Sequence, residues 1–145
     1  MGKLLDIARK SAEGAPMEIL HTVDVTAESG IHGDYRGRSR RRQVTVLSRE
    51  SWEAACTELG VELPWISRRA NLFVEGISLA DSIGKAIWIG SLTLHVTGET
   101  TPCNLMDEAS YGLRQRLEPD WRGGVTCKVI SGGTIEVGDD VRLED

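Results

Sequence analysis

Cys103 is the residue of this sequence best placed for chemistry, because it follows Pro102 where a strand pattern gives way to a helix pattern. Residues 92–97 alternate apolar and polar side chains, which predicts a half-buried strand that ends at Gly98. Residues 104–117 repeat apolar side chains at helical spacing. Cys103 is therefore expected at a helix N-terminus, where free N–H groups favour a thiolate. A structural thiol in a loop is the alternative, since neighbouring carboxylates oppose the thiolate.

The other two cysteines have the pattern of core residues. Cys56 shares one face of a predicted helix with Trp52, and Cys127 lies on the apolar side of a predicted strand. Three widely spaced cysteines form neither a disulfide framework nor a paired metal-ligand pattern. His21 is the polar member of an apolar face in a strand predicted over residues 17–26, so we expect a hydrogen-bonded histidine of the core or of a cleft.

Positive charge is concentrated in one segment. Five arginines fall within seven positions of a protein whose net charge is −5, namely Arg36, Arg38, Arg40, Arg41 and Arg42. A charge run of this kind is typical of a solvated loop, yet guanidinium groups also match the geometry of phosphate. Both interpretations stay open, and we expect one or two of these arginines to face a cleft. The preceding segment, 28–37, is rich in glycine and either turns the chain or brings the backbone close to a ligand.

Length and composition predict a single domain over residues 1–145, with residues 1–16 as an N-terminal extension or a first strand. The first ten residues carry charges throughout and no later segment reaches the length of a membrane span, so we expect a soluble, cytoplasmic protein without a membrane partner. The net charge of −5 argues against a nucleic-acid partner.

The elements that must position these residues are seven or eight short strands with two inserted helices. The first helix is expected over residues 49–59, with Ser48 as its N-cap and Gly60 at its end. Residues 90–91 predict a hairpin that leads into the strand before Cys103, and residues 132–133 predict another. The remaining strands are expected over residues 4–8, 17–26, 43–47, 70–74, 125–129, 134–137 and 141–143. This pattern predicts a β-rich barrel or folded sheet.

Several well-known catalytic motifs are absent from the sequence. It contains no phosphate-binding P-loop, no dinucleotide glycine fingerprint, no HExxH zinc motif and no GxSxG nucleophile elbow. A cysteine protease would need a histidine held against its thiol, and the pattern identifies none of the three histidines as that partner.

Short motifs run in a fixed order through most of the chain, from about Met17 to Val141. They are Gly30-Ile31-His32-Gly33-Asp34, Arg42-Gln43-Val44-Thr45, Arg69-Ala70-Asn71-Leu72, Gly90-Ser91-Leu92, Thr97-Gly98-Glu99 through Pro102-Cys103, Arg122-Gly123-Gly124-Val125 and Gly133-Thr134-Ile135 with Gly138-Asp139. Their order resembles the MOSC domain, the C-terminal domain of molybdenum-cofactor sulfurases. The resemblance implies a mainly β fold with peripheral helices, a β-barrel related to the barrel domain of pyruvate kinase.

The resemblance also implies a chemical role for Cys103. In MOSC domains the cysteine of the Pro-Cys motif is the expected sulfur carrier or molybdenum ligand, so Cys103 would carry sulfur as a persulfide or coordinate molybdenum. Cofactor-binding roles are implied for residues in the other motifs, which are Arg42, Arg69, Asn71, Arg122, His32 and Asp34. Tyr35 departs from many relatives, in which a histidine follows the Gly-Asp pair.

Three functions stay open on this basis. The first is a sulfur carrier, with sulfurtransferase activity, or a molybdenum-cofactor-binding module. Its sulfur donor would be a cysteine desulfurase, and its acceptor the molybdenum cofactor or a molybdoenzyme. The second is a molybdenum-dependent reductase component acting on N-hydroxylated compounds, and the third is a non-catalytic binding domain. Pyridoxal phosphate is expected in the separate desulfurase and not in this chain, which has no room for such a domain.

Overall fold

A computed structural model describes residues 2–144, so Met1 and Asp145 lie outside the described residues. The strands are β1 (Gly2–Arg9), β2 (Glu18–Leu20), β3 (Thr22–Thr26), β4 (Gly30–Ile31), β5 (Val44–Ser48), β6 (Leu72–Glu75), β7 (Ala86–Ile89), β8 (Leu92–Glu99), β9 (Val125–Ser131), β10 (Gly133–Glu136) and β11 (Asp140–Glu144). The α-helices are α1 (Arg49–Leu59), α2 (Asn104–Ala109) and α3 (Leu113–Leu117), and short 3₁₀ helices span Trp65–Arg68 and Pro119–Trp121. Within residues 2–144, no helix is long and apolar enough to cross a membrane.

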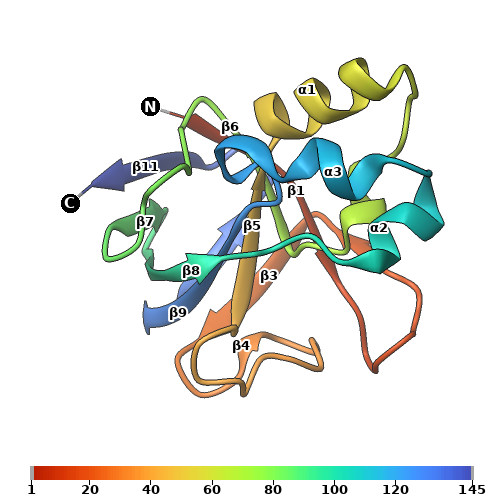
Figure 1. The fold of residues 1–145 in the computed structure, drawn as a ribbon. Helices are drawn as coiled ribbons and strands as arrows, with labels where there is room; N and C mark the ends of the chain where they lie inside the picture. The colour runs from red at the N-terminus through yellow and green to blue at the C-terminus, as the bar shows by residue number, and fades with distance from the viewer. Residues whose placement is uncertain (1, 145) are drawn as a thin grey trace.

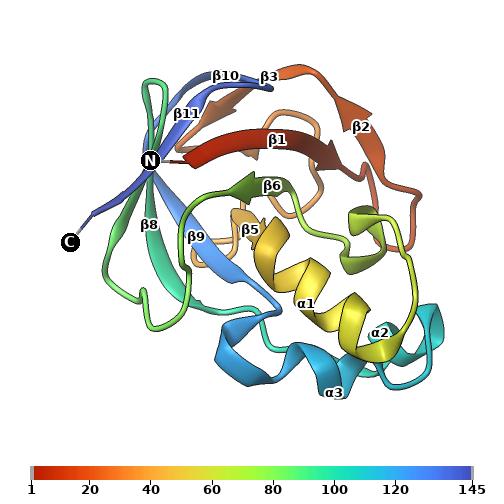
Figure 2. The same cartoon turned by 90° about the horizontal axis from the view of Figure 1, so that it is seen from above.

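Seven strands close into a barrel in the order β11-β7-β8-β9-β5-β6-β1 (Figure 1). Closure occurs because β1 pairs with β6 along one edge and with β11 along the other. The β5–β6 pair is parallel. Strand β2 pairs with the last residues of β1, on the same edge of β1 whose first residues pair with β11. A separate three-stranded sheet contains β10, β3 and β4. The predicted β-barrel with peripheral helices is confirmed, and Figure 2 shows the three α-helices together on one side of it.

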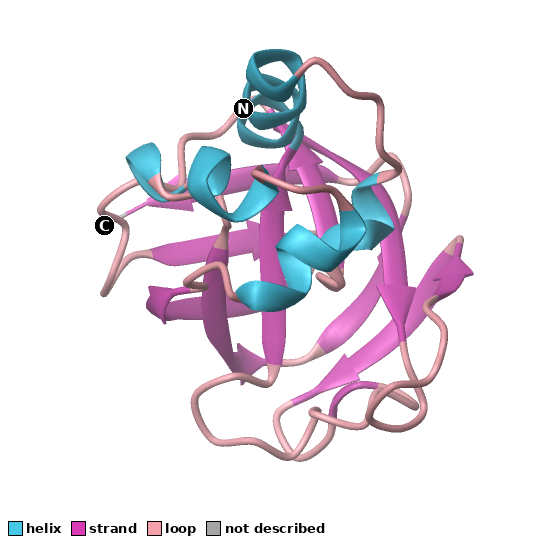
Figure 3. Cartoon of the chain, turned by 45° about the vertical axis from the view of Figure 1, so that its right-hand side comes forward, coloured by secondary structure: helices cyan, strands magenta, loops and turns pink. Residues whose placement is uncertain are grey.

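The core is divided into two apolar clusters by the barrel wall. Alternating residues of β8, Leu92, Leu94 and Val96, are fully buried in the larger cluster, as the period-two pattern predicted. The smaller cluster packs the helices against the barrel and includes Trp52 of α1 and Leu113 of α3. Figure 3 shows the helices lying outside the strands. The larger cluster fills the barrel, and the smaller one fixes the helices outside it.

Helix α1 begins and ends where the sequence predicts. The Ser48 side chain accepts a hydrogen bond from the Ser51 N–H at 3.1 Å, which satisfies one free donor of the first turn. Gly60 ends the helix in the left-handed conformation with φ of 75°.

The chain changes sheets at two places where the sequence predicted continuous pairing. Residues 17–26 form two strands instead of one, because β2 pairs with β1 of the barrel and β3 pairs with β10 of the small sheet. His21 lies at the break. Its side chain is 71% exposed, and its Nε2 lies 3.3 Å from a carboxylate oxygen of Glu136. The prediction that His21 is a histidine of the core or of a cleft is therefore wrong. The hairpin predicted at residues 132–133 is also wrong, since β10 leaves the barrel and pairs with β3.

The helix predicted over residues 104–117 is broken into α2 and α3. The Asp107 carboxylate accepts hydrogen bonds from the backbone N–H groups of Gly112 and Arg114, at 3.1 and 3.2 Å, and so caps the start of α3. Gly112 adopts φ of 93°, which turns the chain between the helices. Leu105 is therefore 56% exposed rather than part of one continuous apolar face.

A glycine turn after the second 3₁₀ helix holds the segment that leads to Cys103 in place by a hydrogen bond. The Gly124 carbonyl accepts a hydrogen bond from the Thr100 N–H at 2.8 Å. Gly124 has φ of 95°, and a Cβ at this position would lie 2.3 Å from the Val46 carbonyl oxygen of β5. The turn can therefore approach β5 only because it has no side chain there.

Replacing Gly124 with alanine is expected to lower the free energy of unfolding by roughly 2–4 kcal/mol, because positive-φ strain and a backbone clash add together. Gly138→Ala is the matched control, since Gly138 has φ of 101° and a Cβ at that position would meet nothing within 4 Å. The control should lose only about 1 kcal/mol. Chemical denaturation measures both losses, and equal losses would contradict the role assigned to the close approach.

Candidate functional site

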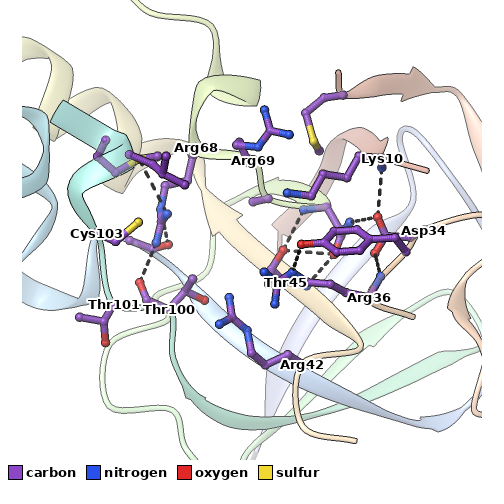
Figure 4. Close-up of a pocket in the computed structure, with 17 residues that line it drawn as sticks. Lys10, Asp34, Arg36, Arg42, Thr45, Arg68, Arg69, Thr100, Thr101 and Cys103 are labelled. Atoms are coloured by element: carbon purple, nitrogen blue, oxygen red, sulfur yellow. Dashed lines mark hydrogen bonds between the residues drawn. The ribbon is translucent and has the colours of Figure 1, made fainter. Parts of the chain in front are cut away.

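A cavity of about 220 Å³ opens beside Cys103. Figure 4 shows Cys103, Arg68 and Thr100 on one side, Lys10, Asp34 and Arg36 on the other, and Thr45 of β5 between them. Five cationic side chains line the cavity, those of Lys10, Arg36, Arg42, Arg68 and Arg69, against the single carboxylate of Asp34. The cavity is thus a local concentration of positive charge in a protein whose net charge is −5.

Cys103 carries the accessible thiol of this protein. It is exposed, lies at the N-cap of α2 in an extended conformation and follows the buried Pro102. Cys56 and Cys127 are buried, as predicted, and burial raises the pKa of both thiols. A reagent that enters the cavity therefore meets one thiol, at Cys103.

Arg68 is a buried cation beside this thiol. Its side chain donates hydrogen bonds from Nε to the Gly123 carbonyl at 3.0 Å and from Nη2 to the Thr100 carbonyl at 2.8 Å. Nη1 lies 3.8 Å from the Met106 sulfur, and no carboxylate within residues 2–144 forms an ion pair with Arg68. Burial lowers the pKa of Arg68 and a negative charge on Cys103 raises it. An arginine stays protonated in proteins, so this charge attracts an anion.

Arg68 is not among the residues that the sequence motifs point to, because the matching motif begins at its neighbour Arg69. Arg69 ends the 3₁₀ helix in the left-handed conformation with φ of 65°, a strained backbone for a residue with a side chain. Its Nη2 donates a hydrogen bond to the Ala15 carbonyl at 2.7 Å. The Arg68-Arg69 pair before a strand was the available signal, and both side chains line the cavity.

The arginine-rich segment contributes two of its five side chains to the cavity. Arg36 and Arg42 line it, which confirms the expectation that one or two arginines face a cleft. Arg42 has no ion pair with any described residue, and its charge lowers the pKa of Arg68. Arg38 and Arg40 are exposed and do not line the cavity, so they match the solvated-loop interpretation.

Asp34 supplies the one carboxylate, and its oxygens are already hydrogen-bonded. Oδ1 accepts from the Lys10 N–H at 3.1 Å and from Asn71 Nδ2 at 3.4 Å, and Oδ2 accepts from the Arg36 N–H at 3.3 Å. These donors are all neutral, so Asp34 forms no ion pair with a lining cation. Its main visible role is to fix the loop after β4 against β1.

Asn71 joins the elements behind the cavity. Its Oδ1 accepts hydrogen bonds from the backbone N–H and the hydroxyl of Thr45, at 3.0 and 3.1 Å. Its Nδ2 donates to the Ala8 carbonyl at 3.1 Å. The side-chain amide therefore ties β1, β5 and the start of β6 together, and it positions the cavity wall.

Tyr35 stands between two cations on the wall opposite Cys103. Lys10 Nζ lies 4.9 Å from its ring centroid and the Arg36 guanidinium carbon lies 5.1 Å away. Arg36 Nε also donates a hydrogen bond to the Tyr35 hydroxyl at 2.6 Å. Partial burial and the charge of Arg69 lower the pKa of Lys10. The aromatic ring thus holds cations at the cavity that would otherwise repel each other.

Two residues expected at the site lie elsewhere. Arg122 Nη2 donates to the Glu58 carboxylate at 2.6 Å and Nη1 donates to the Arg116 carbonyl at 3.0 Å. The hydrogen bond to Glu58 lowers the pKa of that carboxyl, and Arg122 does not line the cavity. His32 is exposed, and its hydrogen bonds are made by the backbone: its carbonyl accepts from Arg9 at 2.6 Å and its N–H donates to the Asp24 carbonyl at 3.0 Å. The motif of Arg122 instead contributes the Gly123 carbonyl that Arg68 contacts.

The arrangement offers a metal a single protein thiolate. No cluster of three or more His, Cys, Asp or Glu side chains suited to a metal ion occurs among residues 2–144. A metal at Cys103 would therefore need to arrive with other ligands already attached.

These features define a small β-barrel protein with a cationic cavity beside an accessible thiol. The family model of the MOSC domain matches residues 24–142, and the chain belongs to the MOSC domain family. MOSC domains are associated with the molybdenum cofactor, which gives the chain a general role in sulfur handling or binding related to that cofactor.

Solved structures share the fold at low sequence identity. The YUAD protein of Bacillus subtilis is 20% identical with a TM-score of 0.81, and the match covers 99% of this chain and 96% of that one. YiiM of Geobacillus stearothermophilus is 16% identical with a TM-score of 0.77, covering 100% of this chain and 76% of that one. YiiM of Escherichia coli is 17% identical with a TM-score of 0.71, covering 99% and 70%. No curated protein matches the sequence.

The charge around Cys103 predicts that this thiol favours an anionic alkylating reagent over a neutral one more strongly than a cysteine in a neutral peptide does. The ratio of the iodoacetate to the iodoacetamide rate constant should exceed that of a neutral cysteine peptide by roughly threefold or more, because positive potential concentrates anions. The same thiolate attacks both reagents, so the ratio is insensitive to the thiolate population. Peptide mass spectrometry over time should locate the label on Cys103 in the folded protein.

Two variants of equal charge change provide the control for this measurement. Arg42→Met should lower the ratio, whereas Arg38→Met should leave it unchanged because Arg38 lies outside the cavity. If the iodoacetate-to-iodoacetamide ratio were the same in both variants and in the unmodified protein, the inference of a local cationic field at Cys103 would be wrong.

Proposed function

We propose that this protein carries sulfur as a persulfide on Cys103 and delivers it for metal–sulfur cofactor chemistry. The observation that supports this most is the exposed Cys103 thiol beside the buried guanidinium of Arg68, which has no carboxylate partner among the described residues. The donor in this proposal is a cysteine desulfurase, and the acceptor is the molybdenum cofactor or a molybdoenzyme.

The transfer needs a nucleophilic sulfur and a stabilised terminal sulfur anion. The Cys103 thiolate attacks the outer sulfur of the donor persulfide, and the donor cysteine leaves as a thiolate when its S–S bond breaks. The new persulfide has a negative terminal sulfur, which the charges of Arg68 and Arg42 favour. Attack by the acceptor on that sulfur restores the Cys103 thiolate, so no external oxidant or reductant is required.

Incubation with a cysteine desulfurase and free cysteine should add one sulfur atom to Cys103. Cys56 and Cys127 should gain none, because both are buried. Peptide mass spectrometry after blocking the persulfide measures the site, and Cys103→Ser should gain no sulfur. Loading of Cys56 or Cys127 in place of Cys103 would eliminate the carrier proposal.

Binding of the molybdenum cofactor is a second candidate, supported by the same cations and by the single thiolate. Cys103 would provide the protein ligand to molybdenum, and Arg42, Arg68 and Arg69 would face the phosphate of the pterin. When bound, the cofactor would supply a redox-active metal centre. The cavity of about 220 Å³ is smaller than typical ligand pockets of about 300–1,000 Å³, which favours the carrier function.

Cofactor binding predicts molybdenum and pterin in protein purified from a host that makes the cofactor. Arg42→Met should lower the pterin content, because it removes a cation from the cavity, and Cys103→Ser should lower the molybdenum content. Metal analysis and pterin fluorescence measure the two quantities. Retention of both in Cys103→Ser would count against this candidate, and Arg38→Met serves as the charge-matched control.

A further inference from the structure

We propose that the cavity beside Cys103 also takes sulfur directly from a small inorganic dianion that carries a sulfane sulfur, namely thiosulfate, without a donor protein. This inference rests on the proposed carrier function of Cys103 and names a chemical class of donor for the same site. In thiosulfate the transferable outer sulfur is attached to a sulfonate group, so the dianion combines an anionic handle with the atom that Cys103 would receive.

The charge balance of the cavity matches a multiply charged anion. Five cations face one carboxylate, and the Asp34 oxygens are already engaged by neutral N–H donors. Arg68 is only 7% exposed and has no carboxylate partner among residues 2–144, although a buried charge is costly unless an opposite charge balances it. A dianion in the cavity would supply that missing charge.

Unused polar groups at the cavity point to an oxyanion. The Thr100 hydroxyl oxygen is buried and has no hydrogen-bond partner within the described chain. Nη1 of Arg68 has only the Met106 sulfur near it, at 3.8 Å, and Arg42 has no ion pair with a described residue. Because sulfonate oxygens accept hydrogen bonds and attract guanidinium groups, one ligand would satisfy all three.

The cavity also has a suitable size. Its volume of about 220 Å³ is enough for several water molecules. Thiosulfate has five non-hydrogen atoms, so it fits with space left for the Cys103 sulfur and a few waters.

The electrostatics favour this donor in particular. A thiolate and a dianion repel each other in water, so their reaction gains more from nearby cations than the reaction of a thiolate with a neutral molecule. Negative charge also develops on the departing sulfite, where Arg42 and Arg68 would stabilise it. A cavity with a large excess of positive charge is thus suited to an anionic donor.

The proposed step is balanced in atoms and electrons. The Cys103 thiolate attacks the outer sulfur of thiosulfate and forms a new S–S bond. The bond between the two sulfurs of thiosulfate breaks, and its electron pair leaves with sulfite. Cys103 ends as a persulfide anion, and a nucleophilic acceptor such as cyanide then takes the outer sulfur as thiocyanate and restores the thiolate.

Reduced protein incubated with thiosulfate should gain one sulfur atom on Cys103, as measured by peptide mass spectrometry. With cyanide present it should form thiocyanate and sulfite continuously, and Cys103→Ser should form neither. Arg42→Met should lower the rate constant for thiosulfate by roughly tenfold more than it lowers the rate constant for loading by a cysteine desulfurase, because only the small donor is a dianion. Arg38→Met is the charge-matched control and should leave both rate constants unchanged.

The two donors separate this inference from the proposed function. Loading of Cys103 by the desulfurase but not by thiosulfate would overturn the inference and leave the carrier function in place, whereas loading by neither donor would overturn both. Equal thiosulfate rates in Arg42→Met and Arg38→Met would overturn the role given to the cavity. Arg68→Met provides a second test, and its unfolding transition must first show that it is folded, since Arg68 contacts two backbone carbonyls.

Discussion

The buried guanidinium of Arg68 is the interaction on which the rest of the site depends. It bonds the Gly123 and Thr100 carbonyls, which belong to two segments far apart in the sequence, and so fixes the approach of the chain to Cys103. A Cβ at Gly123 would lie 3.1 Å from Arg68 Nη2 and 2.5 Å from the Thr100 oxygen, so the guanidinium needs the glycine turn. The same guanidinium group thus joins two segments of the chain by hydrogen bonds and places a positive charge without a carboxylate partner beside the thiol.

Much of the fold follows from local patterns in the sequence. The alternation of Leu92, Leu94 and Val96 predicts the buried face of β8, and Ser48 with Gly60 predicts the bounds of α1. These signals are reliable because the hydrogen bonds and the apolar periodicity that they report lie within one element. The accessible position of Cys103 at a helix start follows in the same way.

Other features depend on partners that lie far away in the sequence. The break at His21 arises because β2 and β3 join different sheets, and no local residue reports that choice. The break between α2 and α3 depends on Asp107, which is an ordinary first-turn acid by sequence and caps the next helix in the structure. Arg122 lies outside the cavity for the same reason, because Glu58 of α1, which is distant in the sequence, pairs with it.

The cavity's charge is likewise a product of barrel closure. Lys10 follows β1, Arg42 precedes β5, and Arg68 precedes β6, so pairing of β1 with β6 and of β5 with β6 brings these cations together. Mutual repulsion and the left-handed backbone of Arg69 both oppose this arrangement. A closed barrel with a continuous apolar core can sustain such local costs, since the strands bearing the cations are fixed by pairing on both edges. The cationic cavity is therefore destabilising by itself, and an anion bound at Cys103 would stabilise the folded protein.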